Sequence, residues 1–248
     1  MNIYSVIGGT GTVGCLIVDE LRAAGEQVRV LSRHSPEYPV DLTTGAGLEA
    51  ALAGCTVVID ASNGSPRAPE AVLVDGARRL RETAERCGVG RIVCVSIVGI
   101  DEVPARYYRA KVAQERVLSE GDVPLSVVRS TQFHELVAGA FAALARFAIS
   151  PRSRARLQPV AAADAARAVA ATAREAAPAA MSSVAGPRAA TVSELAREWT
   201  QVTGRRLAPL ALPLPPRLGR PLRAGALTPA SPDVRGTTEF GSWLRASR

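Results

Sequence analysis

The sequence predicts an α/β fold in which α-helices cover a parallel β-sheet. Short apolar stretches suited to strands alternate along the chain with longer segments of helical periodicity. Hydrophobic residues make up 47% of the chain and aromatic residues only 4%, so we expect a core of Val, Leu, Ile and Ala. The length of 248 residues suits one large α/β domain with a smaller lobe.

The first 150 residues carry the regular alternation. Strands are expected at 2–7, 27–33, 55–62, 91–99 and 124–130, and helices at 13–25, 46–54, 68–88, 109–121 and 134–149. Gly25 is expected to end the first of these helices. Strands that alternate with helices predict right-handed crossovers between parallel strands.

The character of the chain changes after residue 150. Helices are expected at 160–177 and 191–204, with a short strand at 181–186 between them. Seven prolines between 209 and 232 then exclude long regular elements. We therefore expect a core domain over 1–150 and a smaller α/β lobe over 151–248, which covers the carboxyl edge of the sheet and forms one folding unit with it.

A glycine-rich stretch, "VIGGTGTVGC" from Val6 to Cys15, lies between the first strand and the first helix. Gly8 would permit a tight turn, Gly11 would let the backbone approach a pyrophosphate, and Gly14 would let helix and strand pack closely. A bare structural bend is the alternative. The context of strand, turn and amphipathic helix favours dinucleotide binding in a Rossmann-type, doubly wound fold. The expected contacts come from Gly8, Thr10, Gly11, Thr12, Val13 and Gly14.

The second strand ends with an arginine where NAD-binding proteins of this fold place an acid. Arg33 suits a ribose 2′-phosphate, so we expect NADP(H) rather than NAD(H), with His34 as a further contact. A simply solvent-exposed Arg33 is the alternative. Residues after the next two strands are expected to line the adenine and ribose side of the site: Asp41, Leu42 and the segment "DASN" with Asp60, Ala61, Ser62 and Asn63.

Several stretches resemble the atypical branch of the short-chain dehydrogenase/reductase superfamily, and most of all its NmrA-like NAD(P)-binding members from actinobacteria. They include "GGTGTVG", "VVIDASN", "VSIVGID", "YYRAKVAQE" and "RSTQFHELV", which together span about the first 140 residues. Two further stretches, "LQPVAAADAARAV" and "AGPRAATVSELAREW", extend the resemblance into the lobe. The resemblance implies the fold and the cofactor but names no substrate.

The resemblance implies a catalytic Tyr-x-x-x-Lys pair, which Tyr107 and Lys111 match. Residues four apart on a helix share a face, so both can point toward one site. In this chemistry the lysine ammonium holds the nicotinamide ribose and favours the tyrosinate, and the tyrosine hydroxyl protonates the substrate. Tyr108 is a possible substrate contact. Relatives carry the catalytic serine at the position that Ile97 occupies here, so the neighbouring Ser96 is the candidate for that role. The alternative is that the Ser96 hydroxyl only bonds to the backbone.

The stretch "RSTQFHE" follows the strand at 124–130 and, in this fold, lies beside the nicotinamide. Thr131, Gln132 and Phe133 are therefore expected to contact the nicotinamide or the substrate. His134 is a candidate substrate contact and proton donor. The alternative for His134 is packing at the start of the next helix.

The composition narrows the partners. The net charge is +7, with 30 Lys plus Arg against 23 Asp plus Glu, but the arginines are scattered and no aromatic residues interleave the dense run at 151–158. We therefore expect a small-molecule substrate and no nucleic-acid partner. Four cysteines without a Cys-x-x-Cys pair or a histidine cluster predict no metal site and reduced thiols. With no signal peptide or membrane span expected, the prediction is a cytoplasmic monomer or homodimer.

These observations predict an NADPH-dependent oxidoreductase that reduces a small organic substrate by hydride transfer. The resemblance does not decide whether the group reduced is a C=O, C=C or C=N bond or a quinone. Secondary metabolism is the expected setting. A sensor or regulatory protein of the NmrA type, which binds NADP(H) without turnover, is the alternative. The Tyr-x-x-x-Lys pair favours the enzyme, and Ile97 favours the sensor.

Overall fold

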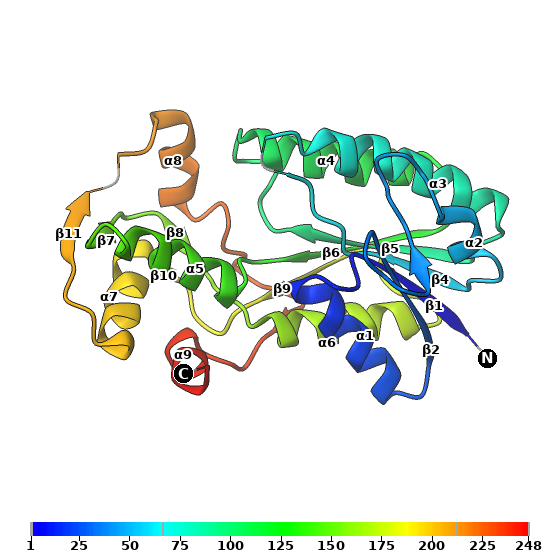
Figure 1. The fold of residues 1–248 in the computed structure, drawn as a ribbon. Coiled ribbons are helices and arrows are strands. Elements are labelled where there is room, and N and C mark those ends of the chain that lie inside the picture. Colours follow the sequence, from blue (N-terminus) through cyan, green and yellow to red (C-terminus); the bar gives the residue numbers. More distant parts are fainter. Residues whose placement is uncertain (1, 66, 212, 248) are drawn as a thin grey trace. The chain divides into compact units, whose positions relative to one another are not determined.

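The computed structural model describes residues 2–65, 67–211 and 213–247 (Figure 1). The chain divides into two compact units that interleave along the sequence. Unit 1 comprises Met1–Ser96, Arg106–Arg129 and Ala166–Ser182, and unit 2 comprises Ile97–Ala105, Ser130–Ala165 and Ser183–Arg248. The sequence suggests a single boundary at residue 150, whereas here short segments on either side of that point join the other unit.

The main sheet has eight strands in the order β12-β9-β6-β5-β4-β1-β2-β3. The strand pairs recorded in this sheet are parallel, and β1 lies between β2 and β4. The chain builds outward from β1 first in one direction and then in the other, which is the doubly wound topology that the sequence predicts. The strands are β1 (Ile3–Ile7), β2 (Gln27–Ser32), β3 (Tyr38–Pro39), β4 (Val57–Asp60), β5 (Arg91–Ile97), β6 (Leu125–Ser130), β9 (Met181–Ala185) and β12 (Val234–Arg235).

Helices cover both faces of the sheet in unit 1. Figure 1 shows α3 (Ala77–Arg86) and α4 (Arg106–Ser119) on one face, with α1 (Thr12–Ala23) and α6 (Ala162–Arg174) on the other. The short α2 (Leu48–Leu52) precedes β4. The core is aliphatic as expected, and its fully buried members include Leu31, Leu52, Val58, Leu80, Ile92 and Leu118.

The helix expected over 68–88 forms in two parts. A π-helical turn, η1 (Ala71–Gly76), leads directly into α3. A Cβ atom on Gly76 would lie 2.9 Å from the Cβ of Leu42, so this glycine permits the close approach of the turn to the chain after β3. The sequence pattern predicts the helix but not the wider turn, because apolar spacing alone does not distinguish the two.

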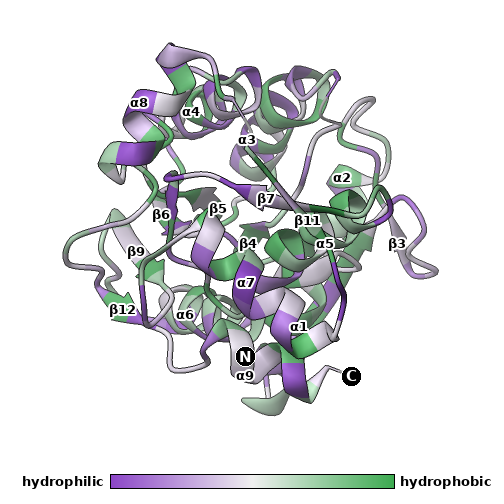
Figure 2. Ribbon diagram, turned by 90° about the vertical axis from the view of Figure 1, so that its left-hand side faces the viewer, coloured by the Kyte–Doolittle hydropathy of each residue, from purple (hydrophilic) through white to green (hydrophobic). Residues whose placement is uncertain are grey.

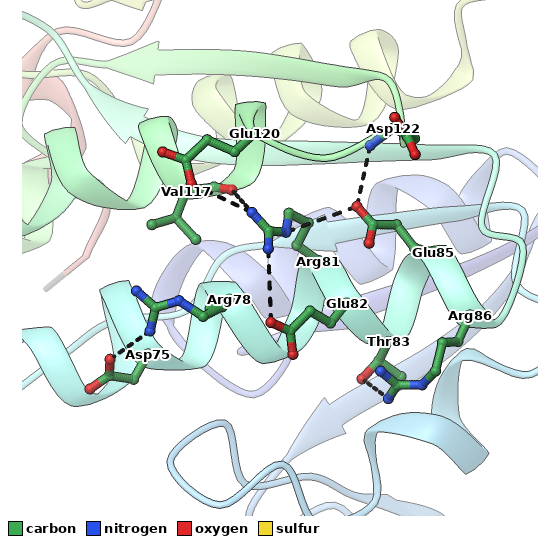
Figure 3. A network of polar contacts seen from close by, with 10 residues as sticks. All are labelled: Asp75, Arg78, Arg81, Glu82, Thr83, Glu85, Arg86, Val117, Glu120 and Asp122. Carbon is green, nitrogen blue, oxygen red and sulfur yellow. Dashed lines mark hydrogen bonds and ion pairs between the residues drawn. The ribbon is translucent and has the colours of Figure 1, made fainter.

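Helix α4 is held against α3 by a polar network around Arg81 (Figure 3). The Arg81 guanidinium donates to the carbonyl oxygen of Val117 at 3.3 Å and lies 3.5 Å from a carboxylate oxygen of Glu120. On α3 it also lies 3.9 Å from Glu85, whose carboxylate accepts the backbone N–H of Asp122. These contacts fix α4, which carries the predicted Tyr-x-x-x-Lys pair.

Unit 2 has its own core and two small sheets. β7 (Ile149–Arg152) pairs with β11 (Ala208–Ala211), and β8 (Arg156–Leu157) pairs with β10 (Ala190–Thr191). The sequence analysis missed these strands because two to four residues are too few to show a period. The helices are α5 (His134–Ala145), α7 (Val192–Thr203), α8 (Pro216–Ala224) and α9 (Phe240–Ala246). Their buried contacts include Val137, Phe141, Leu195, Trp199 and Phe240.

The proline-rich segment contains one helix that the sequence analysis did not predict. α8 is nine residues long, and Pro216 occupies its first position. A proline is tolerated there because the N–H group that it lacks would have no partner within the helix. Gly225 ends it in the left-handed conformation. Figure 2 shows hydrophilic stretches of α8 in purple. No longer element occurs in the described part of this segment, as the prolines predict.

Candidate functional site

The glycine turn after β1 leaves no room for side chains at two positions. Gly8 has a φ of +71°, and a Cβ there would lie 2.6 Å from the carbonyl oxygen of Ala61. A Cβ on Gly14 would collide with the carbonyl oxygen of Gly8. Gly11 closes the turn by donating its N–H to the same oxygen at 2.9 Å. The turn is therefore a compact cradle made of backbone, which fits the close approach of a pyrophosphate.

The N-terminus of α1 is open to an anion. Gly11 is the N-cap residue, no side chain caps the helix, and the first turn carries no acidic residue. The first backbone bond of the helix runs from the N–H of Cys15 to the carbonyl of Gly11 at 3.0 Å, so the preceding N–H groups lack helical partners. Thr10, Gly11 and Thr12 are exposed, while Val13 and Gly14 are buried. Donors and helix dipole together suit a phosphate group.

The turn after β2 presents basic residues. Arg33 and His34 are both exposed, and the N–H of His34 donates to the hydroxyl of Ser32 at 3.3 Å. Further along, Asp41 accepts hydrogen bonds from the Thr43 N–H and hydroxyl at 2.8 and 2.7 Å. These bonds, with smaller contributions from the positive charges of Arg33 and Arg79, lower the pKa of the Asp41 carboxyl. The exposed Arg33 is free to meet a ligand.

Leu42 lies in a different environment from the rest of this predicted group. Its side chain is buried in the aliphatic core of unit 1. The backbone carbonyl oxygen of Leu42 accepts a hydrogen bond from the Arg79 guanidinium at 3.3 Å. A contact of this residue with a cofactor therefore stays a prediction, and its side chain serves the core.

The segment after β4 joins the glycine turn. Ala61 is the residue that Gly8 approaches, and Ser62 donates its N–H to the Asp60 carboxylate at 3.0 Å. The Ser62 hydroxyl oxygen is buried and has no hydrogen-bond partner among the residues that the structure describes. An unpaired buried hydroxyl beside a phosphate cradle fits a missing polar ligand. Asp60 was expected to line the site, but its side chain is completely buried inside unit 1.

The tyrosine of the predicted catalytic pair contacts this same segment. The hydroxyl of Tyr107 donates to the side-chain oxygen of Asn63 at 2.7 Å. Burial, and secondarily the neighbouring Tyr108, raise the pKa of Tyr107 to about 12. The Tyr108 ring meets that of Tyr107 edge-on at 6.1 Å, and burial raises its pKa as well.

The surroundings of Tyr107 in the chain alone act on its pKa in the direction opposite to a neighbouring lysine. A lysine that favours the tyrosinate would lower the pKa of Tyr107, whereas in the chain alone burial raises it. Tyr107 is therefore a neutral hydroxyl over the physiological range of pH.

Lys111 lies within a buried chain of hydrogen bonds. Its ammonium donates to the carbonyl oxygen of Val95 at 2.7 Å and to the side-chain oxygen of Gln114 at 2.6 Å. The amide nitrogen of Gln114 donates in turn to the Asp60 carboxylate at 2.8 Å. The sequence analysis missed Gln114. Its place three residues after Lys111 was the available signal, because residues three apart on a helix are neighbours.

Ser96 is buried near the end of β5, with the half-buried Ile97 directly after it. Successive residues of a strand point to opposite faces, so these two side chains cannot substitute for each other. The catalytic role of Ser96 stays a prediction.

Unit 2 holds the residues predicted to contact substrate after β6. Thr131 is buried and donates its hydroxyl to the Gln158 carbonyl at 2.6 Å. The Gln132 side chain accepts the N–H of Gln158 at 3.3 Å and donates to the Leu227 carbonyl at 3.4 Å. Phe133 is half-buried and precedes α5 as its N-cap residue. Gln132 and Phe133 are the more accessible pair of this group.

His134 packs within the core of unit 2. Its ring is fully buried against Phe240 and Trp243, with centroid distances of 5.4 and 5.5 Å. Its Nε2 lies 3.1 Å from the Pro159 carbonyl, and its Nδ1 has no partner among the described residues. Burial lowers the pKa of this histidine. This environment favours the packing interpretation over the proton donor.

The strand order, the backbone cradle and the open helix N-terminus define a dinucleotide-binding protein of the doubly wound α/β class. The chain belongs to the NAD(P)H-binding family, whose model matches residues 8–176. The match covers the glycine turn, the segment after β4 and all of α4. The NAD(P)-binding family that the resemblance implied is thereby confirmed. No curated protein matches the sequence.

Solved structures share the fold over almost the whole chain. An NADPH-dependent quinone oxidoreductase of Escherichia coli, solved with NADPH, has a TM-score of 0.82 and 18% identity, covering 98% of this chain and 99% of its own. The UDP-glucose 4-epimerase of Thermotoga maritima has a TM-score of 0.76, 18% identity and coverages of 99% and 96%. A short-chain dehydrogenase/reductase superfamily protein of Agrobacterium tumefaciens with bound NAD has a TM-score of 0.75, 16% identity and coverages of 99% and 96%. At these identities the likeness concerns the fold.

The residues that the structure describes contain no group of three or more His, Cys, Asp or Glu side chains that could hold a metal ion. Within residues 2–65, 67–211 and 213–247, no helix has the length and apolar character needed to cross a membrane.

Proposed function

We propose that this protein is an NADPH-dependent oxidoreductase that reduces a small organic substrate. The observation that carries the proposal is a continuous set of contacts in unit 1. The glycine turn touches Ala61 at Gly8, and two residues later Asn63 accepts the hydroxyl of Tyr107. Phosphate cradle and candidate proton donor are thus built on one short segment after β4. When bound, the reduced nicotinamide supplies the hydride.

The cofactor phosphates would rest on the glycine turn and the first turn of α1. The unpartnered N–H groups there would donate to anionic oxygens, and Gly8 and Gly14 let the turn, the helix and the segment after β4 pack closely enough to form the cradle. The exposed hydroxyls of Thr10 and Thr12 add donors at the rim, and Ser62 offers a hydroxyl that the protein itself leaves unpaired. Asp41, Leu42 and Ala61 are proposed for the adenine and ribose side.

Tyr107 acts as the proton donor. The hydroxyl is protonated at neutral pH, so it can give its proton to a substrate oxygen that gains negative charge. Asn63 holds the hydroxyl in place until the substrate competes for it. Lys111 contributes a fixed positive charge beside the ribose. Ser96 and Tyr108 are proposed substrate contacts in unit 1. A substrate contact of the half-buried Gln132 and Phe133 stays a separate prediction for unit 2, whereas the buried His134 is assigned to packing.

Replacing the proton donor tests the enzyme assignment. Tyr107→Phe should lower NADPH oxidation by roughly 100-fold or more, since general acid catalysis contributes about that much, while NADPH affinity stays within twofold. The substrates to assay are ketones, enones, imines and quinones. Tyr38→Phe is the matched control, because it removes the hydroxyl of a tyrosine on β3 that has no proposed role in the site. Equal activity of Tyr107→Phe and the unchanged protein would sink the assignment.

Arg33 accounts for the proposed preference for NADPH over NADH. A guanidinium pairs well with a 2′-phosphate, and Arg33 is exposed at the end of β2. Arg33→Asp should therefore weaken NADPH binding far more than NADH binding, as titration by fluorescence would show. Arg22→Asp, with the same change of charge on α1, is the control. An equal loss for both cofactors would remove Arg33 from the proposal.

A sensor that binds NADP(H) without turnover is the second candidate. Ile97, in place of a substrate-polarising serine, favours it. So does the raised pKa of Tyr107, because nothing in the chain itself activates that hydroxyl. Tight NADPH binding with no oxidation across the substrate panel, in both the unchanged protein and Ile97→Ser, would favour the sensor.

A further inference from the structure

The structure points to Gln114 as a positioning residue that, together with Asp60, fixes the ammonium of Lys111 for the cofactor. We name the set of Asp60, Gln114, Lys111 and the Val95 carbonyl the lysine relay. The proposal rests on the function proposed for Lys111 and adds two residues that neither the motif nor the family match assigns.

The relay is completely internal to unit 1. Lys111 is 3% exposed, and Gln114 and Asp60 are 0% exposed. Its three hydrogen bonds, from Lys111 to Val95, from Lys111 to Gln114 and from Gln114 to Asp60, measure 2.7, 2.6 and 2.8 Å. A buried amine that is held at two points has lost its rotational freedom before any ligand arrives. Because the amine is already ordered in the free protein, binding a ligand costs less conformational entropy and is stronger.

The relay balances two buried charges. An isolated ammonium or carboxylate in the interior is costly, and here one of each is buried with a single amide between them. The charges also fix the amide. The amide oxygen must face the ammonium and the amide NH2 group must face the carboxylate. A flipped amide would place the NH2 group against the ammonium and the oxygen against the carboxylate, so that donors meet donors and acceptors meet acceptors. Gln114 is therefore a spacer with one permitted orientation.

The relay leaves part of the lysine available. An ammonium has three donors, and the bonds to Val95 and Gln114 use two of them. The third donor is the one we assign to a ribose hydroxyl. Asp60 also accepts the N–H of Ser62, so the relay is anchored to the segment that touches the glycine turn and holds Tyr107 through Asn63.

Removal of the amide is the first test. Gln114→Met keeps the length of the side chain and loses both hydrogen bonds. We expect NADPH affinity to fall by about 10-fold to 100-fold, the cost of a slightly misplaced group. Arg116→Met, on an exposed turn of the same helix, is the control. Affinity is measured on the folded fraction, so a purely structural role would lower the melting temperature and leave the dissociation constant unchanged, which would overturn the proposal.

A relocation of the charge is the sharper test. Gln114→Glu puts a second carboxylate against Asp60, and Asp60→Asn leaves the Lys111 ammonium without a counter-charge. Both single variants should lose affinity. The double variant Asp60→Asn with Gln114→Glu moves one carboxylate along the relay, and the new amide can still donate to position 114. We expect NADPH affinity within about threefold of the original. Additive losses in the double variant would refute the relay.

Lys111→Met separates this inference from the proposed function. If that variant binds NADPH as tightly as the unchanged protein, Lys111 has no cofactor role and the proposed function of the pair fails with the relay. If it loses affinity while Gln114→Met does not, the lysine role stands and the relay alone fails. Loss in both variants, with recovery in the charge-relocated double variant, supports both. Because every readout is NADPH binding, none requires the substrate to be known.

Discussion

The glycine turn and the lysine relay are two parts of the cofactor site that we propose in unit 1, and they are built by opposite means. The turn is made of backbone, and its positions are defined by the absence of side chains at Gly8 and Gly14. The relay is made of side chains that bond to one another, to the Val95 carbonyl and to the backbone N–H of Ser62. A backbone site fails through steric conflict, whereas a side-chain network fails through unpaired charge. The two should therefore respond differently to substitution.

The largest effect is expected in the turn. Gly8→Ala combines a positive φ with a clash against the Ala61 carbonyl, so NADPH binding should be lost and unfolding should cost about 3 kcal/mol less. Gly25→Ala is the control, because its φ is +80° but nothing lies within 4 Å of an added Cβ. It should cost only about 1 kcal/mol and spare the affinity. Urea unfolding measures both, and equal losses would show that strain, not the cradle, matters at Gly8.

Removing the charge in the relay comes next. Lys111→Met leaves the Asp60 carboxylate buried without its counter-charge, which should lower the free energy of unfolding by about 3 kcal/mol. Adding Asp60→Asn should recover a substantial part of that loss, since the uncompensated charge is then gone. Urea denaturation of the three proteins gives the values. If the second substitution adds its own full cost, the two charges are not coupled.

Alkaline titration distinguishes the tyrosine from the relay. The pKa of Tyr107 is about 12 in the folded chain against 10.0 ordinarily, so the unfolded chain loses this proton first. Stability should consequently be constant with respect to this group below pH 10 and fall between pH 10 and 12, by at most about 2.5 kcal/mol. Absorbance near the tyrosinate band and urea unfolding follow it. Tyr107→Phe should remove this part of the decline, and an unchanged decline would contradict the assignment.

The smallest effect concerns the support of α4. Arg81→Met removes the hydrogen bond to Val117 and the ion pairs to Glu85 and Glu120. The guanidinium is partly exposed, so we expect a loss of about 1 kcal/mol in unfolding free energy and a less than threefold change in NADPH affinity. Arg78→Met, which removes the exposed pair with Asp75, is the comparison and should cost less. A large loss of affinity would mean that the relay depends on the α3 network.

The backbone part of the site is predictable from the sequence for a physical reason. Glycines at 8 and 14 are needed where they stand, so the glycine spacing, together with the strand before it and the helix after it, indicates the turn and the helix start. The regular elements follow from periodicity in the same way. Short strands such as β10 and the π turn η1 do not, because they depend on contacts distant in sequence.

The side-chain part is only half predictable. The motif indicates Tyr107 and Lys111, but the pairing of Gln114 with Asp60 joins residues 54 positions apart, which no local pattern reveals. The burial that raises the pKa of Tyr107 was not predictable for the same reason, since burial is a property of the folded chain. His134 shows the converse: a lone histidine looked functional, and the aromatic packing around it was not visible in the sequence.

The segment from Asp60 to Asn63 gives each of its four residues a different neighbour: Gln114, the glycine turn, the Asp60 carboxylate and Tyr107. For protein engineering this makes the segment and α4 inseparable. A chimera that exchanges only one of them with a relative would break contacts at both ends, and an inserted residue would shift every partner at once. Grafts that alter cofactor chemistry in this protein should therefore transfer residues 60–63 and 106–119 together, as one cassette.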